Sequence, residues 1–446
     1  MNKNEQYDVT IEDVGANGEG ICHVDGITVF VPFVLPNEKC KIHILKVKDN
    51  IAYAKVIEIF EKSNARVEPL CPVFGKCGGC SLQHASAEFE LDSKKKQIQT
   101  CFKKYAGVQN LDVQMIDSNL EFGYRNKCAF PVRTMNGVAR VCMFKQNSHS
   151  GVEIQSCPLA HGLINRVVKV FSKWLEKFNV SAFDEKENKG VVKFLVCRVL
   201  GNRVLVTVVI NGTKLGSIEK FAQMLEEDGI EFGLNLNINK TNNNVILTDK
   251  FLHVCGIREL EGCENEIKYP VSSLSFMQVN DYIKTQIYNK AISSIHEGSV
   301  VIDAYSGAGL MSAMLARCAK HVYGIEIVGA ATKNADELAR KNDVKNLTNI
   351  NGDCAEKLPE LVKSLQGETV EIVLDPPRKG CDKKVLDAVV ASAPQRVLYI
   401  SCNPATLARD AKVLLDGGFE INEVSGFNMF PKTSHVETVA IFERKE

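Results

Sequence analysis

The chain has 446 residues, an ordinary apolar content and a formal net charge of zero. This length predicts roughly two to four domains, and the zero net charge means that any nucleic-acid binding must use local basic patches. The N-terminal residues are polar and no apolar run is long enough to span a bilayer, which argues against a secretory signal or a membrane span and predicts a cytoplasmic protein. The 16 cysteines are many for a reducing compartment, so clustered cysteines point to metal binding or catalysis.

Residues 1–62 carry short apolar stretches that are separated by glycine and proline. These stretches cover residues 7–11, 27–31, 40–47 and 52–59. Regularly spaced short strands predict a small OB-like β-barrel, a fold that often binds single-stranded nucleic acid. The pattern resembles the TRAM domain, an RNA-binding module of RNA-modifying enzymes. A structural barrel without RNA contact is the alternative.

Four cysteines of the next segment have the spacing of a metal site. Cys71, Cys77 and Cys80 form a Cys-x5-Cys-Gly-Gly-Cys motif, and Cys157 lies far downstream, followed by Pro-Leu. Zinc and a [4Fe-4S] cluster both accept four thiolates, and the spacing does not choose between them. Core cysteines without a ligand are the third interpretation.

Basic residues are frequent around this motif. Residues 88–105 have the pattern of a helix rich in lysine, and such a charge run is usually a solvated helix face. Residues 122–145 interleave aromatic and basic side chains, which suits an RNA surface with stacking positions. They are Phe122, Tyr124, Arg125, Lys127, Phe130, Arg133, Arg140 and Lys145.

The pattern of residues 161–275 is mixed. Residues 163–178 predict an amphipathic helix that holds the only tryptophan, Trp174. Residues 191–200 and 203–210 predict a β-hairpin around Gly201-Asn202, and residues 232–238 and 244–248 predict further strands. Together with the cysteine motif, this predicts an α+β central domain over residues 63–270, without a catalytic constellation outside the cysteines.

Strand and helix patterns alternate from residue 271 to residue 446, which predicts a doubly wound, Rossmann-like α/β domain. Residues 300–310 predict a strand, a turn with Gly307 and Gly309, and a helix. A third glycine at the dinucleotide spacing is missing, so a nucleoside ligand without phosphates, such as S-adenosylmethionine, fits better. Ligands of such folds bind beyond the strand ends, where this sequence has Tyr305, Glu326, Asp353, Asp375 and Cys402.

Cys402 offers a chemical route to methylation of uracil. Carbon 5 of uracil is a poor nucleophile, but addition of a thiolate to carbon 6 makes an enolate through which carbon 5 attacks a methyl sulfonium. A carboxylate must then remove the proton from carbon 5, and Glu437, at the start of the last predicted strand, can serve. The Asp375-Pro-Pro turn also occurs in amino-methyltransferases, but Arg378 stands where those enzymes carry an aromatic residue.

Five motifs together resemble the bacterial RNA uracil-5-methyltransferases, in particular the branch that acts on 23S ribosomal RNA. The resemblance spans essentially the whole chain, and it implies a TRAM-like barrel at residues 1–62, an α+β central iron–sulfur domain at 63–270 and a methyltransferase domain at 271–446. The motifs are Phe276-x-Gln278-Val279-Asn280, Asp303-Ala304-Tyr305-Ser306-Gly307-x-Gly309, Asp375-Pro376-Pro377-Arg378-Lys379-Gly380, Ser401-Cys402-Asn403-Pro404 and His435-Val436-Glu437-Thr438.

The resemblance implies a role for each matching residue. Cys402 is the expected nucleophile and Glu437 the expected base. S-adenosylmethionine is expected to bind to Gln278, Tyr305, Glu326 and Asp375, and Asp353 is a weaker candidate. A [4Fe-4S] cluster is expected on Cys71, Cys77, Cys80 and Cys157.

The implied partner is 23S ribosomal RNA, with no membrane or DNA partner, and the implied state is a monomer. Three alternatives stay open: a tRNA uracil-5-methyltransferase, a non-catalytic iron–sulfur RNA-binding protein, and a zinc protein of the same fold. The tRNA branch usually lacks both the barrel and the cluster cysteines.

Overall fold

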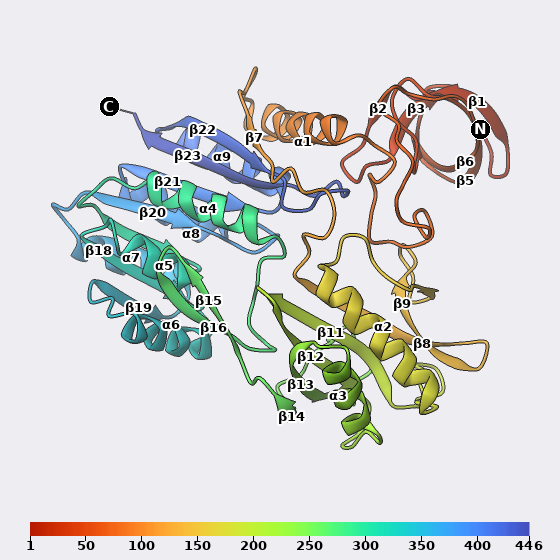
Figure 1. The fold of residues 1–446 in the computed structure, drawn as a ribbon. Coiled ribbons are helices and arrows are strands. Elements are labelled where there is room, and N and C mark those ends of the chain that lie inside the picture. Colours follow the sequence, from red (N-terminus) through yellow and green to blue (C-terminus); the bar gives the residue numbers. More distant parts are fainter. Residues whose placement is uncertain (446) are drawn as a thin grey trace.

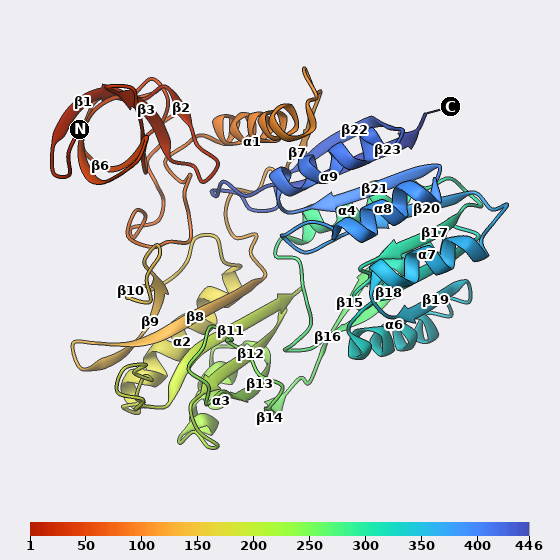
Figure 2. The same ribbon diagram turned by 180° about the vertical axis from the view of Figure 1, so that it is seen from behind.

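The structure is a computed structural model that describes residues 1–445. Its strands form three large sheets of six, seven and eight strands, together with a two-stranded hairpin (Figures 1 and 2). Each large sheet has an apolar core of its own. Among the described residues, no helix is both long enough and apolar enough to cross a membrane.

The N-terminal sheet curls into a small barrel, red in Figure 1. Its strand order is β1-β5-β6-β4-β3-β2. Alternate residues of the strands, such as Cys40, Ile42 and Ile44, are fully buried inside, as expected for strands with one wet face. The barrel predicted for this segment is therefore present. Its strands are β1 (Gln6–Thr10), β2 (Asp13–Val14), β3 (Gly20–Val24), β4 (Ile27–Val31), β5 (Lys39–Lys48) and β6 (Ile51–Glu61).

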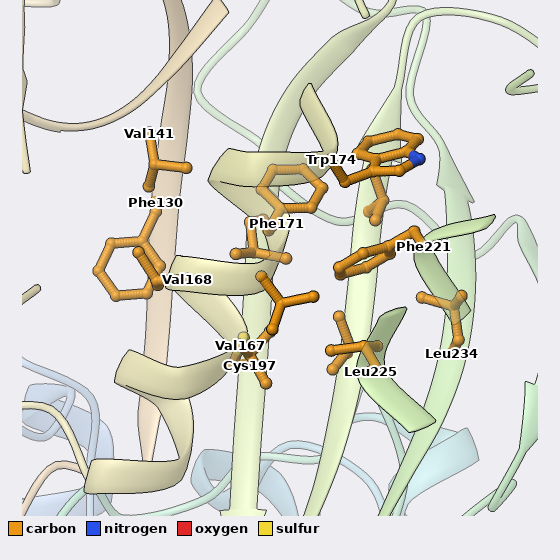
Figure 3. Close-up of a cluster of buried hydrophobic side chains, with 14 of the residues drawn as sticks. Phe130, Val141, Val167, Val168, Phe171, Trp174, Cys197, Phe221, Leu225 and Leu234 are labelled. Carbon is orange, nitrogen blue, oxygen red and sulfur yellow. The ribbon is translucent and has the colours of Figure 1, made fainter. Parts of the chain in front are cut away.

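The central sheet has the order β10-β9-β8-β11-β12-β13-β14, and helices α2 (Gly162–Lys177) and α3 (Ile218–Glu227) cover one of its faces. Figure 3 shows how Phe171, Trp174 and Phe221 from these helices fill the core against the strands. The predicted helix and hairpin are present. The strands are β8 (Lys127–Met135), β9 (Val138–Phe144), β10 (Gly151–Glu153), β11 (Val192–Leu200), β12 (Arg203–Ile210), β13 (Glu231–Ile238) and β14 (Phe251–Gly256).

The strand predicted at residues 244–248 is wrong. These residues form a loop whose backbone oxygens accept hydrogen bonds from the amides of Asn237 and Asn239, and the next strand, β14, begins at Phe251. Side-chain amides therefore occupy the backbone oxygens that would bind a neighbouring strand in a sheet.

The C-terminal sheet has the order β19-β18-β17-β20-β21-β23-β22-β7. The first five strands in this order are parallel, and the chain reverses its direction of travel across the sheet between β17 and β20, the position at which ligands bind in such folds. Its strands are β7 (Gln114–Ile116), β17 (Val300–Ala304), β18 (His321–Glu326), β19 (Leu347–Asn351), β20 (Val370–Leu374), β21 (Arg396–Ser401), β22 (Phe419–Phe427) and β23 (Glu437–Arg444).

Helices lie on both faces of the C-terminal sheet, as expected for a mostly parallel sheet (Figures 1 and 2). They are α4 (Asp281–Ser293), α5 (Leu310–Leu315), α6 (Gly329–Lys341), α7 (Cys354–Ser364), α8 (Lys383–Ser392) and α9 (Pro404–Asp416). The hairpin of β15 (Leu260–Glu264) and β16 (Ile267–Val271) contacts the central sheet as well as α5 and α6. The hairpin therefore connects the central sheet with the helices of the C-terminal sheet.

One early segment crosses to the C-terminal sheet. Helix α1 (Ala87–Cys101) continues into a π-helical turn, η1 (Phe102–Ala106), which packs on α9, and β7 pairs in parallel with β22. The sequence-based division at residues 63 and 270 thus separates α1, η1 and β7 from the sheet on which they pack. The interpretation of α1 as a solvated face is wrong for Lys94, which is 1% exposed.

Candidate active site

The carboxyl ends of β17 to β21 meet at one edge of the C-terminal sheet. Tyr305 follows β17, Glu326 ends β18, Asp353 follows β19, Asp375 follows β20 and Cys402 follows β21. The alternating apolar runs had predicted these strand ends, and the structure contains all of them. Five side chains that are distant in sequence therefore face one region because parallel strands begin and end together.

Cys402 and Glu437 stand opposite each other on two paired strands. β21 and β23 run antiparallel with Ser401 paired to Thr438. Continued by one residue, this register sets Cys402, which follows Ser401, opposite Glu437, which precedes Thr438. Burial, together with the nearby Glu437 charge, raises the pKa of the half-buried Cys402 thiol, and the neighbouring Arg378 guanidinium lowers it. The thiol therefore responds to the charge of the carboxyl group.

Glu437 is held in a protected position. Its residue is 6% exposed, and burial together with the charge of Asp375 raises its pKa to about 8, against the opposing effect of Arg378. An ordinary glutamate is ionised at neutral pH, whereas this one keeps its proton in the absence of substrate. A carboxyl group with this pKa can give up and take back a proton near physiological pH.

Asp375 begins the Asp-Pro-Pro-Arg turn after β20. Solvent reaches its side chain, but the surrounding protein at this edge of the sheet raises its pKa to about 6 by burial. The start of α9 anchors the turn, because Asn403 Nδ2 and Thr406 Oγ1 each donate a hydrogen bond of 3.4 Å to the carbonyl oxygen of Arg378. These contacts hold Arg378 beside Cys402.

The glycine turn after β17 is tied to β18. The Glu326 carboxylate accepts hydrogen bonds from the backbone N–H of Gly307 at 3.0 Å and of Val328 at 2.7 Å. Gly307 has a φ of 56° and Gly309 a φ of 80°, and a Cβ on Gly309 would lie 2.6 Å from the side chain of Ala335 in α6. Tyr305 also has a positive φ of 71°, a strained conformation that is concentrated at functional turns.

Two further acids at this edge support the backbone. Asp303 is 2% exposed, burial raises its pKa to about 7, and it accepts a hydrogen bond of 2.5 Å from Ser312 Oγ at the start of α5. Asp353 caps α7 by accepting a hydrogen bond of 2.9 Å from the N–H of Ala355. Helix capping accounts for the Asp353 carboxylate without a ligand.

Gln278 lies on the loop of residues 272–280, which joins β16 to α4. Asn126 donates to the carbonyl oxygen of Gln278 from its side chain and to that of Val279 from its backbone, both at 3.0 Å. Asn280 then caps α4. These contacts fasten the C-terminal part of the loop, while Phe276 in its middle is 82% exposed.

Sequence reasoning missed a buried charge cluster, which consists of Glu90, Lys94 and Lys432. Each of these residues is 1% exposed. Lys94 Nζ donates to Glu90 and to Asn428 Oδ1 at 2.6 Å each, and the backbone N–H of Lys432 donates to both Glu90 oxygens at 3.0 Å. The i,i+4 spacing of Glu90 and Lys94 was the available signal, but it is equally common on solvated helices. The cluster braces the segment that leads into Glu437.

The cysteine loop also contacts this segment. The backbone N–H groups of Ser81 and Leu82 donate to the carbonyl oxygen of Lys432 at 3.2 and 3.0 Å, and Ser81 Oγ accepts from the N–H of Ser434 at 3.0 Å. Ser81 directly follows Cys80. The position of Glu437 is therefore connected by hydrogen bonds to the cysteine motif.

The four cysteines of the predicted metal site line one small cavity of about 30 Å³. The Sγ of Cys77 accepts a hydrogen bond from the N–H of Gly79 at 3.3 Å, and that of Cys80 accepts from Gln83 at 3.2 Å. Burial raises the pKa of Cys80 to about 12. Within residues 1–445, no group of three or more histidine, cysteine, aspartate or glutamate side chains is arranged to hold a metal ion.

Only part of the predicted RNA surface of residues 122–145 is accessible. Phe130 and Tyr124 are 1% and 5% exposed, and Arg133 and Arg140 form ion pairs with glutamates. Lys145 instead lines a cavity of about 550 Å³ that extends from the barrel and the cysteine loop to residues 433–435. Phe130 lies on β8, where the alternation of the strand directs its side chain into the core, and Tyr124 lies just before this strand. Their burial follows from these positions.

Two family profiles match the chain. The profile of the tRNA (uracil-5-)-methyltransferases matches residues 86–445, and that of the TRAM domain matches residues 2–57. An uncharacterized RNA methyltransferase of Clostridium acetobutylicum is 35% identical, with 100% of this chain and 98% of the relative covered. Another, of Caldanaerobacter subterraneus subsp. tengcongensis, is 37% identical, with 100% of both chains covered.

A solved structure shares the fold. The Pyrococcus abyssi tRNA (uracil-54, C5)-methyltransferase in complex with S-adenosyl-L-homocysteine superposes with a TM-score of 0.79. The superposition covers 98% of this chain and 100% of that chain, at 24% identity. This likeness confirms the predicted α/β methyltransferase fold.

Proposed function

The chain belongs to the tRNA (uracil-5-)-methyltransferase family of S-adenosylmethionine-dependent RNA methyltransferases, and on that premise we propose that it forms 5-methyluridine in 23S ribosomal RNA. The observation that carries the proposal is the pairing of β21 with β23, which sets Cys402 opposite Glu437, with Asp375 and Arg378 alongside. A nucleophile, a carboxyl group with a raised pKa and a neighbouring cation are the groups that this reaction needs.

The reaction begins when the Cys402 thiolate forms a bond to carbon 6 of the uracil. The electron pair of the 5,6 double bond moves onto carbon 5 and the carbonyl oxygen, and carbon 5 takes the methyl group from S-adenosylmethionine. Glu437 then removes the proton from carbon 5. The electron pair left behind restores the double bond and expels the Cys402 thiolate.

Charge coupling between the two residues orders these steps. A protonated Glu437 removes the negative charge that raises the pKa of Cys402, so the thiolate forms more easily while Glu437 holds its proton. Glu437 must lose that proton before it can accept the one on carbon 5. Arg378 favours both anionic forms, because its charge lowers the pKa of each group.

S-adenosylmethionine supplies the methyl group when it is bound, and the strand-end residues suit this nucleoside. The backbone of Gly307 leaves open space, with no atom within 4 Å of the position of a Cβ. Glu326 retains lone pairs for ribose hydroxyls beyond its two backbone hydrogen bonds, and the exposed Ile327 and Val328 offer apolar surface to an adenine. In the proposal, Gln278, Tyr305 and Asp375 complete the site.

The proposal of 23S RNA as the substrate rests on the resemblance of the sequence motifs and the four cysteines to that branch of the family. The barrel does not separate it from tRNA, because the superposition with the tRNA (uracil-54, C5)-methyltransferase covers 98% of this chain. We assign Cys71, Cys77, Cys80 and Cys157 to a [4Fe-4S] cluster, because they share one cavity and two of their sulfurs already accept N–H hydrogen bonds. In such a cluster each thiolate binds a different iron, so the sulfurs need not converge on one point. A bound cluster would fix the loop at Ser81, and methyl transfer needs no electron from it.

Anaerobically purified protein tests the cluster assignment. We expect broad visible absorption with about four irons per chain, and its loss in Cys80→Ser but not in Cys255→Ser, a half-buried cysteine outside the cavity. Colourless protein with bound zinc would replace the assignment by a zinc site.

Covalent trapping tests the reaction and the substrate together. The cluster-loaded protein and S-adenosylmethionine are mixed with total RNA that carries 5-fluorouridine. A base cannot remove fluorine from carbon 5 as it removes a proton, so the enzyme is expected to stall with RNA attached to Cys402. Sequencing of the attached RNA identifies the uridine: adducts in 23S RNA support the proposal, adducts in tRNA change the substrate, and no adduct contradicts the mechanism.

A further inference from the structure

Lys127 and Arg198 face each other across β8 and β11. The two strands are antiparallel, with Arg198 paired to Lys127 and Cys197 paired to Cys128. Both cysteines belong to the core under α2 and α3. Because neighbouring residues of a strand point to opposite faces, the two cations lie on the face of the central sheet that these helices leave uncovered.

Neither cation has an acidic partner. Arg198 is 3% exposed, its Nη1 donates to the carbonyl oxygen of Ser275, and its Nε has no hydrogen-bond partner. Lys127 is half-buried, and among residues 1–445 neither side chain forms an ion pair with a carboxylate. Buried charges in folded proteins are normally paired, because removing an unpaired charge from water costs several kcal/mol.

Burial disfavours both charges, and the charge of Arg198 further disfavours that of Lys127. Burial and the positive charge of Arg198 lower the pKa of Lys127 to about 8, and burial lowers the pKa of Arg198 to about 10. A negative charge placed beside Lys127 would reverse both effects. The pair therefore has the electrostatics of an anion site.

The pair adjoins the candidate active site. Arg198 binds the loop of residues 272–280 at Ser275, directly before the exposed ring of Phe276. Asn126, the neighbour of Lys127, binds the same loop at Gln278. An exposed aromatic ring beside cations suits a nucleotide, whose base stacks while its phosphate takes the charge.

The same face of the sheet continues toward Glu437. Ala129 and Pro131 follow Lys127 at alternate positions of β8 and line the cavity of about 550 Å³, whose far side includes Ser434 and His435. A single RNA strand can therefore run from the cation pair along the sheet to the segment before Glu437.

We propose that Lys127 and Arg198 form a phosphate-binding site for the RNA strand that flanks the target uridine. Lys127 contacts the phosphate, while Arg198 adds positive charge and positions the loop that carries Phe276. This inference rests on the proposed function for the identity of the strand. It assigns to the central sheet the task of fixing the register of the RNA, because phosphate contacts position a strand and base contacts identify it.

RNA affinity as a function of salt tests the site. The dissociation constant of a 23S fragment that contains the trapped uridine is measured from low to high KCl for wild type, Lys127→Gln, Lys127→Arg and Lys169→Gln. Lys169 is an exposed lysine of α2 on the opposite face of the same sheet and serves as the matched control. We expect Lys127→Gln to bind about tenfold more weakly at low salt and to reduce the salt slope by about 0.7.

Lys127→Arg should restore the affinity and the slope, and Lys169→Gln should leave both unchanged. A slope for Lys127→Gln equal to that of wild type would overturn the proposal, as would an equal loss in Lys169→Gln. Thermal unfolding of each variant verifies that the protein is folded.

Single uncharged methylphosphonates in the RNA locate the phosphate. One is placed at each position within a few nucleotides of the target uridine. At the contacted position, wild type should lose about tenfold in affinity, and Lys127→Gln should lose nothing further, because the contact is already absent. Additive losses at every position would overturn the placement beside the target.

Methylation by wild type in the same samples separates the two proposals. Binding without 5-methyluridine would contradict the proposed function while the salt slopes and methylphosphonates still decide the phosphate site. Methylation with no effect of Lys127→Gln on binding would contradict the phosphate site alone.

Discussion

Two regions beside Glu437 bury ionisable groups in opposite ways. In the buried charge cluster, Lys94 and Glu90 are bonded to each other, to Asn428 and to the backbone of Lys432. In the candidate active site, burial instead raises the pKa of Glu437 to about 8 and also raises the pKa of Cys402. A buried group with partners holds structure, whereas one without partners retains its reactivity for a ligand.

The first region supports the second. The buried charge cluster fixes Lys432, whose backbone has a positive φ of 65°, five residues before Glu437. Burial of paired charges adds little net stability, but removing one member leaves an unpaired charge inside. The comparison therefore predicts that loss of the Cys402 thiol alters activity and leaves stability intact, and that loss of the Glu437 carboxyl group changes how stability depends on pH. Changes in the buried charge cluster should alter stability first.

Cys402→Ala is expected to have the largest effect on activity. The variant loses the nucleophile, so methyl transfer should fall by about 10⁵-fold or more, while binding of S-adenosylmethionine persists. Because Cys402 is half-buried, its free energy of unfolding should change by no more than about 1 kcal/mol. Single-turnover methylation and denaturant unfolding are the measurements, and appreciable turnover would contradict the assigned role.

Lys94→Met should break the buried charge cluster. It removes the ammonium bonded to Glu90 and leaves only that of Lys432, 3.9 Å from Glu90 Oε2, beside the buried carboxylate, so we expect a loss of about 3 kcal/mol in the free energy of unfolding. Lys96, an exposed residue of the same helix, is the control, and Lys96→Met should change the free energy of unfolding by less than about 0.5 kcal/mol. Urea unfolding compares the two, and equal effects would contradict the structural role of Lys94.

Glu437→Gln should change how stability depends on pH. The pKa of Glu437 is about 8 in the folded protein against the ordinary 4.5, so between these values the folded state binds more protons than the unfolded state. The free energy of unfolding therefore falls as pH rises through this range, and glutamine removes that loss.

The stability of Glu437→Gln relative to wild type should accordingly rise by a few kcal/mol from pH 5 to pH 8, at about 1.4 kcal/mol for each unit of pKa shift. Glu420→Gln, an exposed change on β22, should show no such trend. Unfolding at both pH values measures the difference. A gap that is independent of pH would be inconsistent with a buried, protonated Glu437.

The smallest effect is expected at an exposed ion pair. Lys412 and Asp416 lie four residues apart on α9 with an N···O distance of 2.8 Å, and their side chains are 51% and 64% exposed. Lys412→Ala should change the free energy of unfolding by no more than about 0.5 kcal/mol. A loss comparable to that of Lys94→Met would show that burial is not what separates the two kinds of pair.

Much of the candidate site could be predicted because its signals are local. Each strand that ends at the candidate active site is a short apolar run, and Tyr305, Glu326, Asp375 and Cys402 follow such runs directly. The parallel arrangement then brings the ends together without further information. The prediction of a strand at residues 244–248 failed because side-chain amides donate hydrogen bonds to the backbone oxygens there. Such hydrogen bonds leave no periodic pattern in the sequence.

The sequence by itself determined the N-terminal barrel, the strand ends of the C-terminal sheet and the positions of Cys402 and Glu437 at strand ends, because these depend on apolar periodicity and on neighbouring residues. Only the tertiary structure decided that Lys94 is buried against a segment 334 residues away, that β7 joins the C-terminal sheet, and that Lys127 faces Arg198. A lysine on a solvated helix and a lysine buried beside a carboxylate have the same local pattern. The difference lies in what packs over them, which is a property of distant parts of the chain.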